Sequence, residues 1–290
     1  MKLYKIMDRK WLWFCISLVV IAVGLISMAV RGLNWGTDFT GGSVLHYDIH
    51  QSYSLDDVRN ILNKLDLKDF EAKKAGDDEQ ELILRTIPLG AEQQNEITNE
   101  LKQKWHNIEL VRTDKVDAII GKELQRKAVI ALILANIGML IYISFRFEFR
   151  SAVAAIVALI HDVLILISLF AVFRLPLDIT FIAALLTIVG YSINDTIVIF
   201  DRIRENLKVT SKVSFDELAD KSITQTMSRT INTSLTTLIT ITMLFLFGGE
   251  TIKDFALALI IGIVSGTYSS IFIANPIWSL LRKNTKPVKV

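Results

Sequence analysis

Long apolar blocks alternate with polar segments along this 290-residue chain, and the polar segment 31–126 is by far the longest of them. A helix needs about 20 predominantly apolar residues to cross the hydrocarbon core of a bilayer. Six blocks approach or exceed that length: Trp11–Val30, Ile130–Phe145, Ala152–Phe173, Leu177–Phe200, Ile231–Phe247 and Phe255–Leu281. The pattern predicts an α-helical polytopic membrane protein with six transmembrane helices, divided into 1–30, an extramembrane domain 31–126, and 127–290.

The first apolar block has an alternative interpretation as a secretory signal peptide, because it follows a basic start and Ser27-Met-Ala29 resembles a cleavage site. Its apolar stretch is longer than the usual core of about 7–15 residues. Five further blocks follow it, and we therefore expect an uncleaved first helix.

The distribution of basic residues predicts the orientation. Lysines and arginines gather at 2–10, 146–150, 202–221 and 282–289, whereas the short loops Arg174–Asp178 and Gly248–Asp254 hold one each. The positive-inside rule then predicts both termini in the cytoplasm, 31–126 outside, and a bacterial inner membrane location. Arg31, Arg126 and Lys127 run against the rule at the edges of that domain.

The segment 31–126 shows the order β-α-β-β-α-β, which is typical of a ferredoxin-like fold. The expected strands are Ser43–Ile49, Phe70–Lys74, Glu81–Ile87 and Ile108–Arg112, and the expected helices follow Ser54 and Pro88. We see no catalytic constellation there. His46, His50 and His106 are interpreted as surface or structural residues rather than metal ligands.

Charged residues inside the apolar blocks are the main functional signal, because each costs about 3 kcal/mol or more in a bilayer. Asp195 lies in the fourth block, Arg229 precedes the fifth, and Asp162 follows His161 in the third. The fourth and fifth blocks run antiparallel from one loop, which places Asp195 and Arg229 at similar depth, where they can pair.

Two interpretations of that pair remain open. Asp195 can be a protonatable carboxylate whose ion pair with Arg229 breaks on protonation, or the pair can be a permanent link between helices. Asp162 is a weaker candidate for proton coupling, since His161 and Asp162 can equally form hydrogen bonds within the bundle.

Small and polar residues give further expectations. The Ser/Thr series from Thr224 to Thr242 either lines a hydrated path or packs between helices. Gly190, Gly262 and Gly266 are expected to permit close helix packing. Ser214 and Glu217 fit a capping box, which predicts a short amphipathic helix on the membrane within the cytoplasmic loop 201–222.

Several functional classes are excluded or disfavoured. The net charge of +2 does not indicate a nucleic-acid-binding protein, and Cys15 is the sole cysteine. The sequence has no nucleotide-binding glycine loop and no zinc-type His/Glu spacing. We therefore expect a protein that is not an enzyme, has no cofactor or metal, and depends on an ion gradient.

Three motifs resemble those of the SecF family. Trp35–Gly42, which includes Gly36, Asp38, Gly41 and Gly42, is similar to its glycine signature. Val189–Asn206, which includes Gly190 and Asn194, is similar to its fourth-helix signature, and Ser228–Ser234 fits its fifth helix. The resemblance covers essentially the whole chain.

That resemblance implies a subunit of the SecDF complex, within the resistance-nodulation-division superfamily. The complex assists the SecYEG channel and SecA in exporting unfolded preproteins with the proton gradient. Asp195 and Arg229 match the family's coupling residues, SecD supplies a further acidic residue, and membrane lipids surround the spans. The alternatives are an exporter of small molecules or lipids and a scaffold that does not transport.

Overall fold

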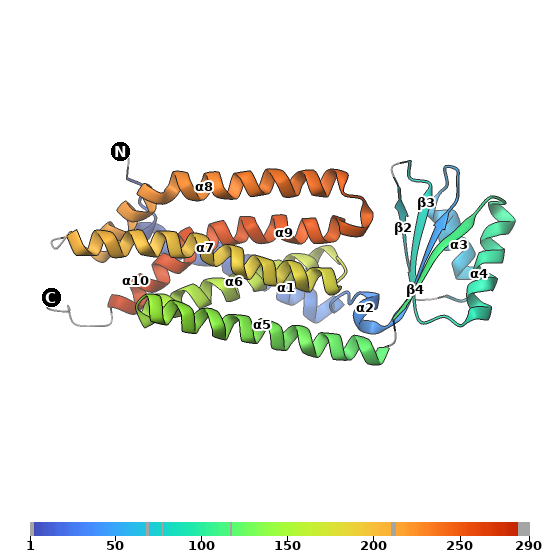
Figure 1. The fold of residues 1–290 in the computed structure, drawn as a ribbon, viewed down its shortest axis with the longest axis horizontal. Coiled ribbons are helices and arrows are strands. Elements are labelled where there is room, and N and C mark those ends of the chain that lie inside the picture. Colours follow the sequence, from blue (N-terminus) through green and yellow to red (C-terminus); the bar gives the residue numbers. More distant parts are fainter. Residues whose placement is uncertain (1–2, 68–69, 77, 117, 210–212, 284–290) are drawn as a thin grey trace.

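The computed structural model describes residues 3–67, 70–76, 78–116, 118–209 and 213–283. It has two parts, a helical bundle and a small domain with a sheet beyond one end of it (Figure 1). Six helical segments in the described residues are long and apolar enough to span a membrane. The prediction of six spans is thus confirmed.

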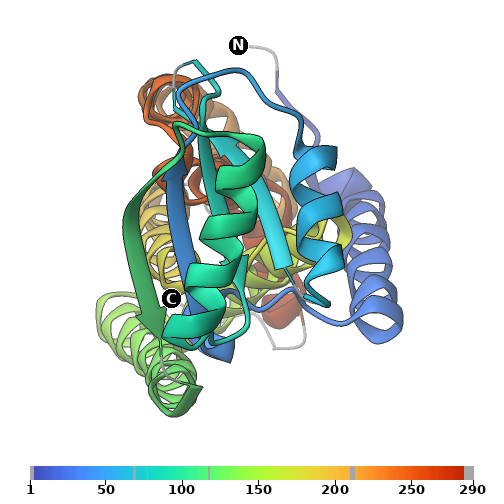
Figure 2. The same ribbon diagram turned by 90° about the vertical axis from the view of Figure 1, so that its right-hand side faces the viewer.

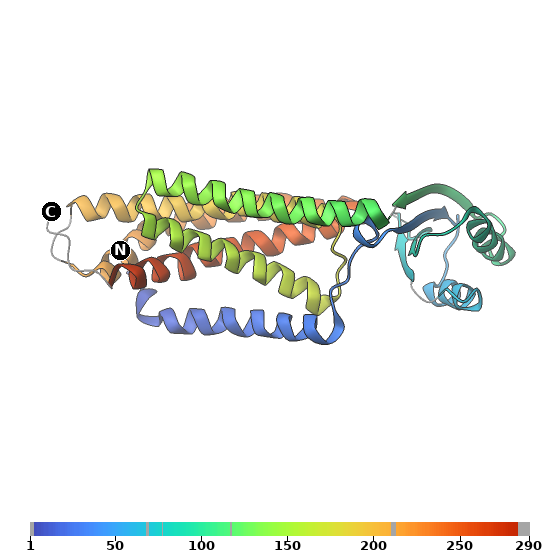
Figure 3. The same ribbon diagram turned by 90° about the horizontal axis from the view of Figure 1, so that it is seen from below.

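The bundle is built from long helices in chain order. After a 3₁₀ turn at Met7–Arg9, they are α1 (Lys10–Arg31), α5 (Ala118–Arg146), α6 (Phe149–Phe173), α7 (Ile179–Val209), α8 (Phe215–Phe247), α9 (Glu250–Ser269) and α10 (Asn275–Lys283). Helices α6, α7 and the α9–α10 segment are the most buried, whereas α1, α5 and α8 lie at the periphery. Figure 3 shows α1 and α5 on opposite flanks, with α6 between them.

The sixth span is not a uniform α-helix. A π-helical segment, Ser270–Ala274, joins α9 to α10, and the Asn275 side chain donates to the Ser270 carbonyl at 2.6 Å. Pro276 has no backbone N–H and cannot donate the α-helical hydrogen bond to the carbonyl four residues earlier. The π-helical turn at Ser270–Ala274 lies directly before this proline.

Glycines set the closest helix approaches in the bundle. A Cβ at Gly24 would lie 2.1 Å from Ser168 Cβ, and one at Gly262 would lie 2.1 Å from Ile188 Cδ1. Gly266 faces Ser192 in the same way at 2.8 Å, which confirms the packing role expected of Gly262 and Gly266. Gly190 differs: it is exposed, and no atom lies within 4 Å of its added Cβ. Gly190 lies on the outer face of α7 and contacts no other helix in the described part of this chain, so the predicted packing role of Gly190 was wrong.

The small domain lies between α1 and α5 in the chain. After α2 (Thr37–Thr40), it consists of β1 (Gly42–Asp48), α3 (Leu55–Lys64), β2 (Phe70–Ala75), β3 (Glu81–Thr86), α4 (Ala91–Lys104) and β4 (Glu109–Val116). All pairings are antiparallel, in the order β2-β3-β1-β4, with Leu45 opposite both Leu84 and Thr113. The register shifts between His46 and Tyr47 on the β4 side.

Alternation along the strands produces a two-layer domain. Leu45, Tyr47 and Leu84 point into an apolar core with Leu62 of α3 and Leu101 of α4. Figure 2 views the domain from its outer end, and α3 and α4 cover the face of the sheet that points away from the bundle. The opposite face, which carries His46 and Arg85, lines a cavity of about 340 Å³ toward the loops of the bundle.

Two boundaries differ from the sequence prediction. Helix α5 begins at Ala118, before the predicted domain limit at 126, because the helix continues past its apolar stretch into the polar segment. In 201–222, the structure shows no separate amphipathic helix among the described residues. Instead, α7 continues to Val209, and Ser214 caps α8, which runs for 33 residues into the fifth span. The cap was predicted correctly, but it starts the spanning helix itself.

Candidate functional site

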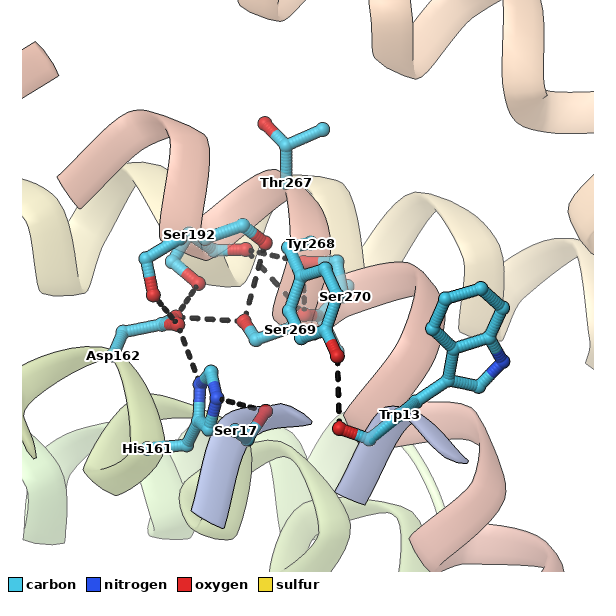
Figure 4. Close-up of polar contacts among 12 residues, drawn as sticks. Trp13, Ser17, His161, Asp162, Ser192, Thr267, Tyr268, Ser269 and Ser270 are labelled. Atoms are coloured by element: carbon cyan, nitrogen blue, oxygen red, sulfur yellow. Dashed lines mark hydrogen bonds and ion pairs between the residues drawn. The ribbon is translucent and has the colours of Figure 1, made fainter. Parts of the chain in front are cut away.

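The most extensive polar cluster in the bundle surrounds Asp162 of α6, whose residue exposure is 1%. Three serine hydroxyls donate to its carboxylate at 2.7 Å each: Ser265 to Oδ1, and Ser192 and Ser269 to Oδ2. His161 Nδ1 lies 3.1 Å from Oδ1 and is the fourth neighbour. Figure 4 shows His161, Ser192 and Ser269 around the carboxylate of Asp162. Each oxygen of the carboxylate therefore has two polar neighbours.

Helix periodicity and one glycine bring these serines together. Ser265 and Ser269 are four residues apart, so they lie on one face of α9. Gly266 allows α7 to approach this face, and Ser192 then reaches the same carboxylate. A larger residue at 266 would separate the two helices and disrupt the cluster.

His161 extends the cluster toward the first helix. Its Nε2 lies 2.8 Å from the Ser17 hydroxyl, and its ring stacks on Tyr268 with centroids 6.0 Å apart. Tyr268 in turn donates its hydroxyl to the carbonyl of Trp13 at 2.9 Å. The cluster thus connects α1, α6, α7 and α9 through buried polar contacts (Figure 4).

Asp195 of α7 lies in a poorer polar environment. Its residue exposure is 3%, and its carboxylate accepts one hydrogen bond from the described residues, from Ser234 of α8 at 3.3 Å. The Ser234 hydroxyl also lies 2.7 Å from that of Thr267. The two buried carboxylates therefore differ: Asp162 has four polar neighbours, whereas Asp195 has one.

Arg229 does not form the expected ion pair. Within the described residues, no salt bridge of 4.0 Å or less joins it to Asp195, and its side chain is exposed on α8. Arg229 is exposed on α8 and points outward rather than at Asp195, so the predicted ion pair does not form in this structure.

A polar stripe surrounds Arg229 on the outside of the bundle. On α8, Arg229, Asn232 and Thr236 are exposed, and on α7 Gly190 and Asn194 are exposed at helical spacing. Tyr191 joins the two helices by donating to the Thr233 carbonyl at 3.1 Å. Because lipid tails provide no hydrogen bonds, a stripe of this kind in a membrane is suited to contact with another protein.

The glycine motif connects the small domain to α7. The Gly36 N–H donates to the Leu177 carbonyl at 2.7 Å, and Asp38 Oδ2 accepts from the Ile179 N–H at 3.0 Å. Gly41 has φ +75°, and a Cβ at Gly42 would lie 2.5 Å from the Thr86 carbonyl oxygen. The motif thus requires glycine for its backbone and attaches the start of β1 to the first turn of α7.

The described residues offer little for a metal. They contain no group of three or more His, Cys, Asp or Glu side chains that would hold an ion. The polar neighbours of Asp162 are hydroxyls and an imidazole, and that of Asp195 is one hydroxyl, which suits hydrogen bonding rather than metal binding.

Sequence reasoning identified Asp162, Asp195 and Arg229 but missed the serines that distinguish the first two. Ser265 and Ser269 were visible as a pair four residues apart, close to two glycines. That spacing showed a small polar face on the last helix, but it could not show that the face meets Asp162.

Comparison with known proteins agrees with this architecture. Residues 96–284 match the family "Protein export membrane protein SecD/SecF, C-terminal", and residues 26–45 match the "SecD/SecF GG Motif". The protein translocase subunit SecF of Sebaldella termitidis is 40% identical, with 98% of this chain and 94% of the relative covered. That of Alicyclobacillus acidocaldarius is 42% identical, with 95% and 92% covered.

Solved structures agree as well. A crystal structure of SecDF from a Thermus species, described as a translocon-associated membrane protein, superposes with a TM-score of 0.88 at 35% identity over 98% of this chain. A super-membrane-facing form of SecDF gives 0.74 at 33% identity. This chain spans only 39% of those SecDF chains. The family match over most of the chain and the near full-length relatives show that the chain belongs to the SecF family of protein translocase subunits.

Proposed function

We propose that this chain is a proton-coupled accessory subunit of the Sec translocase, which works with SecD to assist preprotein export through SecYEG and SecA. Asp195 is the proton-coupling carboxylate, and Arg229 is the cation that responds to its charge. In this proposal both termini are cytoplasmic, and the ferredoxin-like small domain lies on the outer side of the inner membrane.

The contrast between the buried carboxylates of Asp162 and Asp195 carries the proposal. Burial disfavours the charged form of a carboxylate, whereas hydrogen-bond donors stabilise it. Asp162 has four polar neighbours on α6, α7 and α9, which suits it to be a structural anchor that holds these helices together. Asp195 has a single donor at 3.3 Å. Protonation of Asp195 therefore sacrifices little hydrogen-bond stabilisation of the carboxylate, which makes Asp195 the better candidate for the residue that gains and loses a proton.

The outward position of Arg229 supports a partner in the membrane. A lone arginine facing lipid costs about 3 kcal/mol or more at the bilayer centre. The polar stripe around Arg229 extends over two helices, and a partner that contributes an acidic side chain would neutralise the arginine there. We assign this surface to SecD. Protonation of Asp195 then changes the balance of charge among Asp195, Arg229 and the acidic side chain of SecD, rather than between Asp195 and Arg229 alone.

The most direct test is gradient-dependent export into inverted membrane vesicles that contain this chain with SecD. We expect Asp195→Asn to abolish the stimulation of export by an imposed proton gradient. Asp195→Glu is the matched control, since it keeps a titratable carboxylate and should retain part of the response. Full stimulation in Asp195→Asn, at normal levels of assembled complex, would contradict the proposal.

The orientation has its own test. Cys15 is the sole cysteine, so a Cys15→Ser background allows single cysteines to be introduced. Ser52 is exposed in the small domain. We expect Ser52→Cys to react with a membrane-impermeant maleimide in intact spheroplasts. Protection of Ser52→Cys until the membrane is opened would reverse the orientation.

A further inference from the structure

An apolar groove lies between the helices at the end of the bundle next to the small domain. It has a volume of about 210 Å³ and is lined by residues of α1–α2, α5, α6 and α7. Gln125 is the one polar side chain among the described residues that line it; Phe39, Leu132, Ile167 and Leu186 are typical of the rest. The groove is therefore suited to a hydrocarbon chain.

A basic rim adjoins this groove on α5. Lys122, Gln125, Arg126, Val129 and Ile130 line a shallow depression, and Gln125 and Val129 belong to the groove as well. The two hollows are therefore continuous along α5, and the charged groups lie nearer its amino-terminal end. This arrangement places positive charge at one end of an apolar slot.

The two cations on this rim are available for a ligand. Lys122 and Arg126 are four residues apart on one helix face, are exposed, and have no ion-pair partner among the described residues. The neighbouring Lys127 differs, since its Nζ lies 2.8 Å from Glu123 Oε1. Trp35 also lines the groove, and tryptophan is enriched at the level of lipid headgroups.

We propose that this groove binds an anionic phospholipid from the leaflet on the side of the small domain. One acyl chain lies in the apolar groove between α5 and α7, and the phosphate lies between Lys122 and Arg126. Charge complementarity selects an anionic headgroup, because each basic residue near a membrane surface adds about 1 kcal/mol of attraction to anionic lipid. The site also explains why basic residues stand at an edge where the topology rule disfavours them.

The experiment is native mass spectrometry of the full chain, equilibrated with equal amounts of phosphatidylglycerol and phosphatidylcholine that carry the same acyl chains. We expect phosphatidylglycerol to predominate among the retained lipids. In Lys122→Gln/Arg126→Gln, the preference should fall about fivefold per charge removed. Lys127→Gln is the matched control, because it removes one charge from the same helix without touching the rim, and it should keep the preference.

A groove variant separates the two parts of the site. Ala128 lines the groove, so Ala128→Phe should reduce retention of both lipids while leaving their ratio unchanged. Two results would overturn the proposal: a phosphatidylglycerol preference in Lys122→Gln/Arg126→Gln equal to that in Lys127→Gln, or lipid retention unaffected by Ala128→Phe. Both kinds of variant alter exposed or half-buried side chains, and thermal unfolding in detergent verifies that each is folded.

Discussion

Replacement of Asp162 by asparagine is the sharpest test of the distinction between the two buried carboxylates. In the structure, Oδ1 faces Ser265 and His161, whereas Oδ2 faces Ser192 and Ser269. An asparagine keeps one oxygen and presents an N–H₂ group in place of the other. Two of the four neighbours therefore lose their acceptor, and serine hydroxyls must rotate to accept instead.

The expected cost follows from these contacts. Hydrogen bonds to charged groups contribute about 1.5–3 kcal/mol each, so losing two removes about 3 kcal/mol or more. Relief of the desolvation of a buried charge opposes part of this loss. We expect a net loss of about 2 kcal/mol, which is about a 30-fold change in the unfolding equilibrium constant. Asp195→Asn, which affects one bond of 3.3 Å, should cost under about 1 kcal/mol.

Reversible unfolding in bicelles, with detergent as the denaturant, measures both variants on one scale. We expect Asp162→Asn to lose stability, and Asp195→Asn to lose the proposed response of export to the proton gradient while remaining stable. The opposite pattern, in which Asp162→Asn is as stable as the native chain but fails in gradient-dependent export, would show that Asp162 is the titrating group.

Three further predictions concern other parts of the fold. Asp38→Ala removes the acceptor for the Ile179 N–H and should lower the free energy of unfolding by about 1 kcal/mol. We expect it to reduce export in the vesicle assay by more than this loss of stability explains. Asp38→Asn, which keeps an oxygen, is the control. Gly24→Val forces α1 away from Ser168 and should lower the free energy of unfolding in detergent by about 1–3 kcal/mol, whereas Gly138→Val, with no atom near its added Cβ, should not. Burial lowers the pKa of His46 below its ordinary value of 6.5, so the unfolded chain binds more protons; the small domain should lose stability as pH falls below about 6.5, and His46→Gln should flatten this pH dependence in hydrogen exchange.

The spans were predictable because a bilayer imposes both length and apolarity on each helix. The strands and helices of the small domain were predictable in order, because alternation in Ser43–Ile49 and the helical spacing after Ser54 are local patterns. Helix ends were less predictable. Helices α5 and α7 continue past their apolar stretches, and composition alone gives no reason for a polar helix to stop at the membrane surface.

The site was predictable in its charges but not in its geometry. The positions of Asp195 and Arg229 along the chain predict that they lie at similar depth, yet each residue turns a helix by 100°, so depth does not give the direction in which a side chain faces. Arg229 is exposed on the outside of α8 and does not face Asp195. The cluster around Asp162 depends on the rotation of α6, α7 and α9 about their axes, which tertiary packing fixes through Gly262 and Gly266.

Helix α7 physically connects Asp195 to the small domain. Asp195 lies 16 residues beyond Ile179 on one continuous helix, or about 24 Å along its axis. The same helix is attached at its first turn to Gly36 and Asp38, and Lys73 of β2 adds an ion pair of 3.5 Å with Asp254 of α9. Under the proposed function, we therefore expect a tilt of α7 that follows a change of charge at Asp195 to move the anchor of β1 directly. No chain of side-chain rearrangements is needed, because a rigid helix transmits the displacement.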